Sequence, residues 1–175
     1  MLHRRVDFAQ IALVRMAKHQ LSMSTYDRLK AEFDDLTTRG RIDVANKIER
    51  ARELGDLKEN GDYHAAKDEQ GHMEGRIRQI ESILEDAEVV SPAPDGVVGL
   101  GSIVAIVYEG DSEDAAEHYL IGHVEEKPDE DHISVMSPSS PLGSALLGAT
   151  VGATVSYDAP NGKLKVTVLL TRTQG

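Results

Sequence analysis

The sequence has no cysteine and no tryptophan, and its aromatic residues are 2 Phe and 5 Tyr in 175 residues. Without cysteine there can be neither a disulfide framework nor a thiolate zinc site, so we expect a cytoplasmic protein. No apolar run approaches the roughly 20 residues that a membrane-spanning helix needs, so we expect no membrane partner. This length fits one large domain or two small ones.

Positive charge is also scarce, because 19 Lys and Arg against 30 Asp and Glu give a net charge of −11. A chain this acidic is poorly suited to gripping free duplex nucleic acid, which requires clustered lysines and arginines. One local exception runs from Arg39 to Arg52, where five basic residues face only Asp43 and Glu49. Without further information, an ordinary solvated helix face explains this stretch best.

Residues 1–15 precede the first strong pattern of the chain. Two arginines stand ahead of several apolar residues, as in a signal sequence, but Asp7 and Arg15 interrupt the apolar segment that a signal would need. We therefore interpret residues 1–15 as an extension without an assigned function and treat Met16 as a candidate natural start.

Two helical patterns fill residues 16–90. Two such helices joined by a short loop should lie antiparallel with their apolar seams together. At about 27 to 30 residues each, and about 1.5 Å per residue, the hairpin would reach roughly 40 to 45 Å. Within each run the seam residues recur three or four positions apart: Leu29, Phe33 and Leu36 and then Val44, Ile48 and Ala51 in the first helix, and Tyr63, Ala66, Gln70, Met73, Ile77, Ile80, Leu84 and Ala87 in the second.

The ends of these helices also carry signals. Ser22 or Ser24 can cap the first helix, Gly55 can close it, and the second helix should start at residues 60–62. The first seam slips after Leu36, so the strict heptad is lost and supercoiling should relax there.

The turn between the helices, residues 53–64, contains Asp56 and Glu59 near two glycines. Their three-residue spacing fits a capping box, which is the preferred interpretation without other information. Two exposed carboxylates at a tip could instead bind a cation. Magnesium takes six oxygens, so this pair would form half a site and the remaining ligands would come from elsewhere.

The pattern changes after the helices. Two prolines and a glycine in residues 91–96 predict a linker, which we place at residues 91–97. Ser140, Pro141 and Gly148 bracket one short helix, and Asn161-Gly162 predicts a β-hairpin. Runs rich in β-branched residues predict strands at 102–108, 117–121, 132–136, 154–157 and 164–170. The expected fold is therefore α+β, with an antiparallel coiled-coil hairpin at 16–90 and a mostly antiparallel sheet with one short helix at 98–175.

Residues 51–66, with the sequence ARELGDLKENGDYHAA, are followed by Gln70-Gly71 and by residues 74–77, and together they resemble the tip and returning helix of the bacterial Gre transcript cleavage factors, in particular the GreA branch. Residues 137–148 and 160–162 resemble the carboxy-terminal domain of the same family, which implies an FKBP-like domain. The resemblance extends from about residue 16 to the end of the chain.

The resemblance implies a transcription elongation factor whose coiled coil enters the secondary channel of bacterial RNA polymerase. The acidic pair of the family matches Asp56 and Glu59, which would help hold a catalytic Mg²⁺ shared with the polymerase active site. Backtracked nascent RNA would then be cut near its 3′ end by the polymerase's own activity, so this chain would not itself be an enzyme. We expect a monomer that binds Mg²⁺ jointly with the polymerase and not alone.

Other positions acquire roles through the same resemblance. Arg52 and Lys67 match family positions that lie close to the extruded RNA 3′ segment, where positive charge attracts phosphates. The family often has an arginine at the position of Lys67. A lysine there keeps the positive charge but lacks the planar set of hydrogen-bond donors of a guanidinium group. Three residues of the later motif are implied polymerase contacts, although Ser144 departs from the basic residue that often follows it: Ser137, Pro138 and Leu142.

Two other functions remain open at this point. A channel-binding protein that inhibits the polymerase without cleavage is one, although relatives of that kind typically carry an altered tip. A prolyl isomerase is the other, because an FKBP-like domain invites it. Such an active site is lined with aromatic residues, and after residue 90 the chain offers only Tyr108, Tyr119 and Tyr157.

Overall fold

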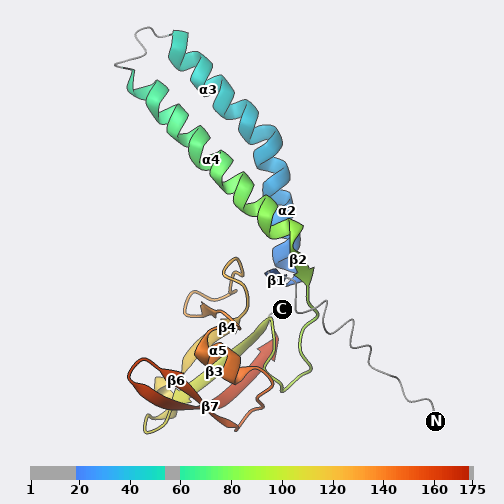
Figure 1. The fold of residues 1–175 in the computed structure, drawn as a ribbon, viewed down its shortest axis with the longest axis vertical. Helices are drawn as coiled ribbons and strands as arrows, with labels where there is room; N and C mark the ends of the chain where they lie inside the picture. Colours follow the sequence, from blue (N-terminus) through green and yellow to red (C-terminus); the bar gives the residue numbers. More distant parts are fainter. Residues whose placement is uncertain (1–18, 54–59, 174–175) are drawn as a thin grey trace, which may run out of the picture. The chain divides into compact units, whose positions relative to one another are not determined.

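The computed structural model describes residues 19–53 and 60–173. These residues form two compact units, which we call the hairpin unit and the sheet unit. The hairpin unit is Tyr26–Ala87, and the described residues on either side of it in the chain make up the sheet unit (Figure 1). None of the described helices is both long enough and apolar enough to cross a bilayer.

The hairpin has two helical arms that run side by side in Figure 1. The first arm consists of α2 (Met23–Asp35), a π-helix η1 (Leu36–Gly40) and α3 (Arg41–Glu53), and the second arm is α4 (Gly61–Glu85). The predicted hairpin is therefore confirmed. Its buried seam consists of Leu29, Val44, Ile48 and Ala51 from the first arm and Ala66, Ile77, Ile80 and Ile83 from the second.

Two polar side chains define the ends of these arms as the sequence predicts. The Ser22 hydroxyl oxygen accepts a hydrogen bond of 3.2 Å from the Thr25 amide in the first turn of α2. The Asn60 side-chain oxygen accepts one of 3.1 Å from the Tyr63 amide, which caps α4. The predicted stop at Gly55 lies outside the described residues.

The seam slip after Leu36 takes the form of the π-helix η1. Leu36 and Val44 are eight residues apart, where two steps of a heptad alternation would give seven, so one residue is extra. A π-turn contains one more residue than an α-turn, so it absorbs the extra residue and returns Val44 to the seam. Thr38 supports this turn, because its hydroxyl donates a 2.6 Å hydrogen bond to the Asp34 carbonyl.

The sheet unit contains a five-stranded sheet of order β5-β4-β3-β7-β6. All its neighbouring strands are antiparallel except β4 and β5, which are parallel. The helix α5 (Pro141–Leu146) packs near β6, and Ser140 caps it by accepting from the Gly143 amide at 3.0 Å. The strands are β3 (Ser102–Tyr108), β4 (Glu117–Ile121), β5 (Ser134–Met136), β6 (Thr154–Ala159) and β7 (Gly162–Thr173), with a 3₁₀ turn η2 (Glu113–Ala115) before β4.

Both faces of this sheet are covered. On the face that α5 covers, the buried core contains Val104, Ile106 and Leu146, and the other face buries Ile103 and Leu120. The strand β3 is consequently buried at six consecutive residues. This explains why its sequence is a continuous apolar run and not an alternating one.

A second, two-stranded sheet joins β1 (His19–Leu21) to β2 (Ala87–Val89). The sequence assigned residues 16–90 to the helical hairpin, so this pairing was missed. The Val90 amide extends it by donating a 2.9 Å hydrogen bond to the Leu21 carbonyl, and Leu21 is fully buried. The chain passes from one unit to the other twice, between residues 25 and 26 and between residues 87 and 88, and the second boundary lies ahead of the linker placed at 91–97.

Candidate functional site

The candidate site is built around the connection between α3 and α4. Asp56 and Glu59, the predicted catalytic and metal-binding pair, belong to this connection and lie outside the described residues. The described residues on either side show how the connection is closed. The side-chain nitrogen of Asn60 donates a 2.5 Å hydrogen bond to the carbonyl of Ala51, so one residue both caps α4 and ties it to α3.

The two predicted RNA-binding residues lie on one side of the hairpin near this end. The Arg52 guanidinium carbon is 5.8 Å from the centre of the Tyr63 ring, a cation–π distance, and both residues border the connection. Lys67 follows Tyr63 by one helical turn, and its ammonium donates a 2.5 Å hydrogen bond to the Gln70 side chain. Both cations are exposed and have neutral partners, so this side keeps its positive charge. The sequence had assigned Tyr63 to the seam and missed its contact with Arg52.

The opposite side of the hairpin has a different charge balance. A shallow groove there is lined by Lys47, Arg50, Asp62 and Glu69, with alanines between the arms. Lys47 donates to both carboxylate oxygens of Glu69 at 2.6 and 2.8 Å. Two cations and two carboxylates cancel, so the groove lacks the net positive charge that a phosphate backbone requires.

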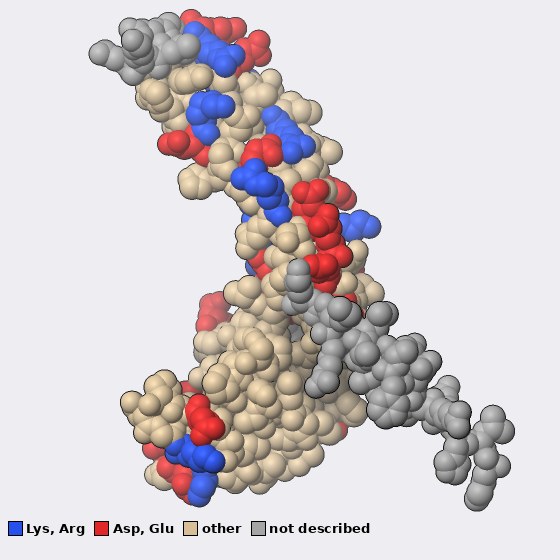
Figure 2. Space-filling view, in the orientation of Figure 1, with Lys and Arg blue, Asp and Glu red and all other residues tan. Residues whose placement is uncertain are grey.

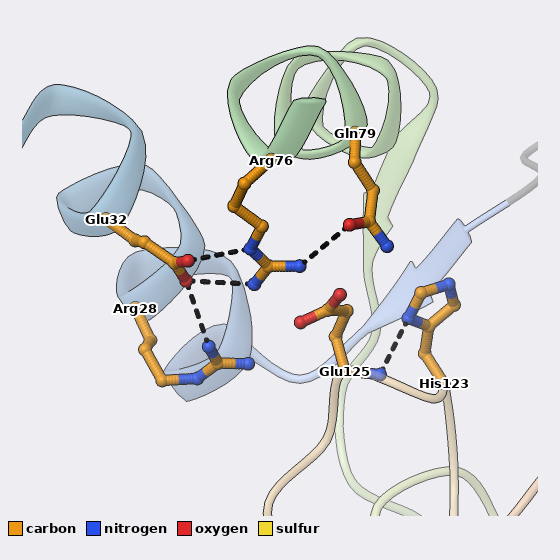
Figure 3. Close-up of polar contacts among 6 residues, drawn as sticks. All are labelled: Arg28, Glu32, Arg76, Gln79, His123 and Glu125. Atoms are coloured by element: carbon orange, nitrogen blue, oxygen red, sulfur yellow. Dashed lines mark hydrogen bonds and ion pairs between the residues drawn. The ribbon is translucent and has the colours of Figure 1, made fainter. Parts of the chain in front are cut away.

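Bidentate ion pairs brace the two arms. Arg41 donates to the two carboxylate oxygens of Glu74 at 2.9 Å each, and this contact lowers the pKa of Glu74 and raises that of Arg41. Further along the hairpin, Arg76 donates to both oxygens of Glu32 at 2.7 and 2.9 Å (Figure 3). Arg28 lies 3.5 Å from the same carboxylate. Such bidentate pairs fix the register of the arms, because the two parallel hydrogen bonds form only when the guanidinium and the carboxylate are aligned.

The predicted polymerase contacts lie in the turn before α5 and in its first residues. Ser137 is exposed and Pro138 is half-buried, whereas Leu142 is buried in the core of the sheet unit. Gly143 makes this turn possible, since a Cβ at that position would lie 2.1 Å from the carbonyl oxygen of Ser137. The turn therefore presents Ser137 and Pro138 outward, while Leu142 holds it from inside.

The tyrosines of the sheet unit pack against the core that α5 covers. The hydroxyl oxygens of Tyr108 and Tyr157 are 3.5 Å apart, and this contact together with burial raises the pKa of Tyr108. Burial, with a hydrogen bond to Glu117, raises the pKa of Tyr119 to about 12. The Tyr108 and Tyr119 phenols are therefore neutral at physiological pH. In the described part of the chain, no group of three or more His, Cys, Asp or Glu residues could hold a metal ion.

Comparisons with known proteins match both units. The family described as "Transcription elongation factor, N-terminal", of GreA and GreB, matches residues 19–89, and the carboxy-terminal GreA/GreB family matches residues 93–171. The chain is 46% identical to GreA of Streptomyces avermitilis over 145 residues, covering 82% of this chain and 86% of that protein. It is 48% identical to GreA of Saccharopolyspora erythraea over 151 residues, covering 85% and 91%.

Among solved structures, GreA factor homolog 1 of Thermus thermophilus is 27% identical, with 88% of this chain and 98% of that chain covered and a TM-score of 0.40. The matched regions define the class as a transcription elongation factor. Within that class the chain belongs to the Gre family, as its sequence resemblance indicated, and the two relatives named above are both GreA proteins.

Proposed function

We propose that this chain inserts its hairpin into the secondary channel of RNA polymerase and stimulates cleavage of backtracked nascent RNA by the polymerase. One observation carries the proposal: the sequence has Asp56 and Glu59 in a stretch that resembles the acidic tip of the Gre family, within residues 19–89 that the family matches. The structure supports it, because the two arms end beside this connection and Arg52 and Lys67 share one side there.

The proposed role of Asp56 and Glu59 is to complete a magnesium site that the polymerase begins. Two carboxylates can serve as part of a magnesium site, but they provide too few oxygens to form a complete site by themselves. A bound Mg²⁺ would supply Lewis acidity and an activated water. The chain's own contribution is to place the two carboxylates of Asp56 and Glu59. On this proposal the polymerase is the enzyme, and the chain is its cytoplasmic, monomeric cofactor.

Arg52 and Lys67 are proposed to contact the phosphates of the extruded RNA. Their shared side has unbalanced positive charge, whereas the groove on the other side is neutral. The stacking of Arg52 on Tyr63 also limits the number of rotamers the guanidinium visits, which lowers the entropy lost on binding. Affinity for a backtracked complex should therefore depend on these two residues.

The turn before α5 is proposed to dock on the polymerase. Ser137 and Pro138 are available for contact there, and the buried Leu142 would act by holding the turn in shape. A channel-binding inhibitor would need the same turn and the same hairpin, so docking alone does not separate the two functions. The carboxylates of the tip do separate them.

The test uses Asp56→Asn and Glu59→Gln in a cleavage assay on stalled, backtracked complexes. Each variant should bind the polymerase as wild type does, because charge at the tip changes and the docking turn does not. The cleavage rate should fall about a hundredfold or more, because the stabilisation that metal catalysis supplies is worth several kcal/mol. Asp62→Asn is the matched control, since Asp62 is an exposed acid in the first turn of α4.

Three outcomes are informative. Loss of cleavage in the tip variants with full activity in Asp62→Asn supports the proposal. A wild-type protein that binds and releases no short RNA would make inhibition the better function. Turnover of a proline-containing peptide by the isolated chain would instead revive the isomerase.

A further inference from the structure

A hollow between the two arms of the hairpin has no part in the functions proposed above. It has a volume of about 370 Å³. Pockets that bind ligands in proteins start at roughly 300 Å³, so this space is large enough to hold one big side chain of a partner. We call it the Gly40 hollow. Three of its lining residues are apolar and five are polar and exposed: Leu36, Gly40 and Met73, and Asp43, Asn46, Lys47, Arg50 and Glu69.

Gly40 keeps the hollow open. A Cβ at this position would lie 3.1 Å from the sulfur of Met73 and 3.6 Å from Cδ2 of Leu36. Both of these atoms belong to lining residues, so a side chain at residue 40 would enter the space between them. Met73 itself suits a surface that adapts to a partner, because its thioether chain is flexible and polarizable.

The π-turn η1 shapes the same space. The Thr37 hydroxyl donates a 2.7 Å hydrogen bond to the Phe33 carbonyl. Arg39 donates to both carboxylate oxygens of Asp35 at 2.9 Å each. With Thr38, three consecutive side chains therefore stabilise this turn. None of the five residues of η1 is buried, so the turn restores the seam without filling the space beside it, and π-turns of this kind are frequent at functional sites.

The rim of the Gly40 hollow carries opposite charges at its two ends. Asp43 and Arg50 both belong to α3 and are about 10 Å apart along the helix axis. Among the residues that the structure describes, neither forms an ion pair, whereas Lys47 and Glu69 neutralise each other at 2.6 Å. A partner that fits this rim therefore has a cation opposite Asp43 and a carboxylate opposite Arg50, with an apolar group between them. Two cations and two carboxylates leave no net charge to attract a phosphate backbone.

We infer that the Gly40 hollow receives an apolar side chain of RNA polymerase, which a basic and an acidic residue flank on the polymerase surface. This inference rests on the proposed function, which inserts the hairpin into the secondary channel. Gly40 lies about 20 Å before Glu53, the last residue of α3, at about 1.5 Å per residue. The hollow therefore belongs to the half of the first arm that is nearer to the connection.

The side of the hairpin on which the hollow lies favours a protein partner. The hollow shares Lys47, Arg50 and Glu69 with the neutral groove described above. It therefore lies on the side away from Arg52 and Lys67, which are proposed to face RNA. In a channel, the side of the hairpin that does not face RNA faces the protein wall.

The experiment blocks the hollow with Asn46→Trp, because Asn46 is exposed and lines the hollow. Single-turnover cleavage on backtracked polymerase complexes is measured with the full-length chain over a range of protein concentrations. The half-saturating concentration should rise about tenfold, because the anchor side chain can no longer enter. The saturating rate should stay within about twofold of wild type, because the tip carboxylates are unchanged and the lost contact serves binding alone. A half-saturating concentration within about twofold of wild type would overturn the inference.

Two matched variants separate the hollow from added bulk and from the lost amide. Ile42→Trp adds the same side chain to α3 at a residue that is 62% exposed and does not line the hollow, so it should bind as wild type does. Asn46→Ala shortens one rim residue and leaves the hollow open, so it should weaken binding by about twofold and not tenfold. A loss in Ile42→Trp equal to that in Asn46→Trp would assign the effect to bulk on the hairpin. An equal loss in Asn46→Ala would assign it to the amide, and either result contradicts the inference.

A photoreactive benzoylphenylalanine in place of Asn46 identifies the occupant of the hollow. On backtracked complexes it should cross-link to a polymerase peptide in which an apolar residue lies near a basic and an acidic one. Adducts confined to RNA, or to a second copy of this chain, would overturn the inference. A wild-type chain that fails to bind the polymerase would refute the proposed function. A wild type that cleaves RNA, beside an Asn46→Trp variant that binds equally tightly, would refute the inference alone, so the two failures differ.

Discussion

The hairpin and the sheet unit are stabilised in different ways. The sheet unit has apolar residues on both faces of its central strand, and the face in view in Figure 2 is largely free of charged side chains. The hairpin buries a single stripe of small and medium residues between its arms. Lysines, arginines and acids alternate over its visible surface, and bidentate pairs such as Arg41–Glu74 link its arms.

The unit with the larger core is therefore not the unit that carries the residues proposed for catalysis. A two-sided core makes the sheet unit cooperative, so a small turn such as the one before α5 can be held rigidly. The hairpin has one packed seam, so each of its turns is stabilised mainly by its neighbours. The residues proposed for catalysis and RNA binding belong to the hairpin, which has the smaller core. The ends of its helices therefore need specific caps.

The largest expected effect compares one isoleucine from each unit. Ile106→Ala should destabilise the sheet unit by about 4 kcal/mol, because the cavity is enclosed on all sides. Ile77→Ala should cost the hairpin about 2 kcal/mol, because the arms can close around a missing side chain beside solvent. Urea unfolding followed by hydrogen exchange in each unit measures both. Equal losses, or one transition shared by both units, would contradict the comparison.

A smaller effect tests the cap at the tip. Asn60→Ala removes the acceptor for the Tyr63 amide and the donor to the Ala51 carbonyl. Loss of an N-cap typically costs about 1 kcal/mol. The change should appear as faster hydrogen exchange in the first turn of α4 and the last turn of α3, with β3 unaffected. Asp62→Asn, in the same turn, should leave those exchange rates unchanged; slower or equal exchange in Asn60→Ala would show that the cap is not needed.

The smallest effect concerns pH in the sheet unit. Burial lowers the pKa of His123 below its usual 6.5, and the neighbouring His19 lowers it further, while Glu125 and Glu126 act in the opposite direction. The folded state then binds a proton less readily than the unfolded chain. The stability that neutral His123 contributes is complete above about pH 6.5 and is lost as the pH falls through the lowered pKa. Melting curves between pH 5 and pH 8, with wild type beside His123→Gln, measure this; a slope that survives the substitution assigns it to another group.

Local signals account for what the sequence predicted. Strands β3 and β4 begin and end at the expected residues, and Ser140 and Asn60 cap the helices assigned to them. The register slip after Leu36 was visible in the spacing. The π-helical form of this slip was not visible in the spacing, because it depends on packing against the other arm. A Cβ at Gly40 would lie only 3.1 Å from the Met73 sulfur of that arm.

Contacts between distant segments account for what was missed. Strands β1 and β2 are too short to show a pattern, and they pair residues nearly 70 positions apart. Glu126 looked like one acid in an acidic loop, because the hydroxyls of Thr25 and Ser22, which donate hydrogen bonds to its carboxylate, lie 101 and 104 residues away. The turn between the helices indicated by itself that Asp56 and Glu59 could form half of a magnesium site. Their catalytic role, and the RNA-binding roles of Arg52 and Lys67, came from the family resemblance.

The central claim is that this chain supplies carboxylates to an active site that the polymerase owns. The direct measurement is the size of the RNA released from a backtracked complex containing Mg²⁺, with and without the protein. The account predicts short 3′-terminal fragments and a shortened transcript that resumes elongation when the protein is added. An intact transcript on a polymerase that is demonstrably occupied by the protein would contradict it.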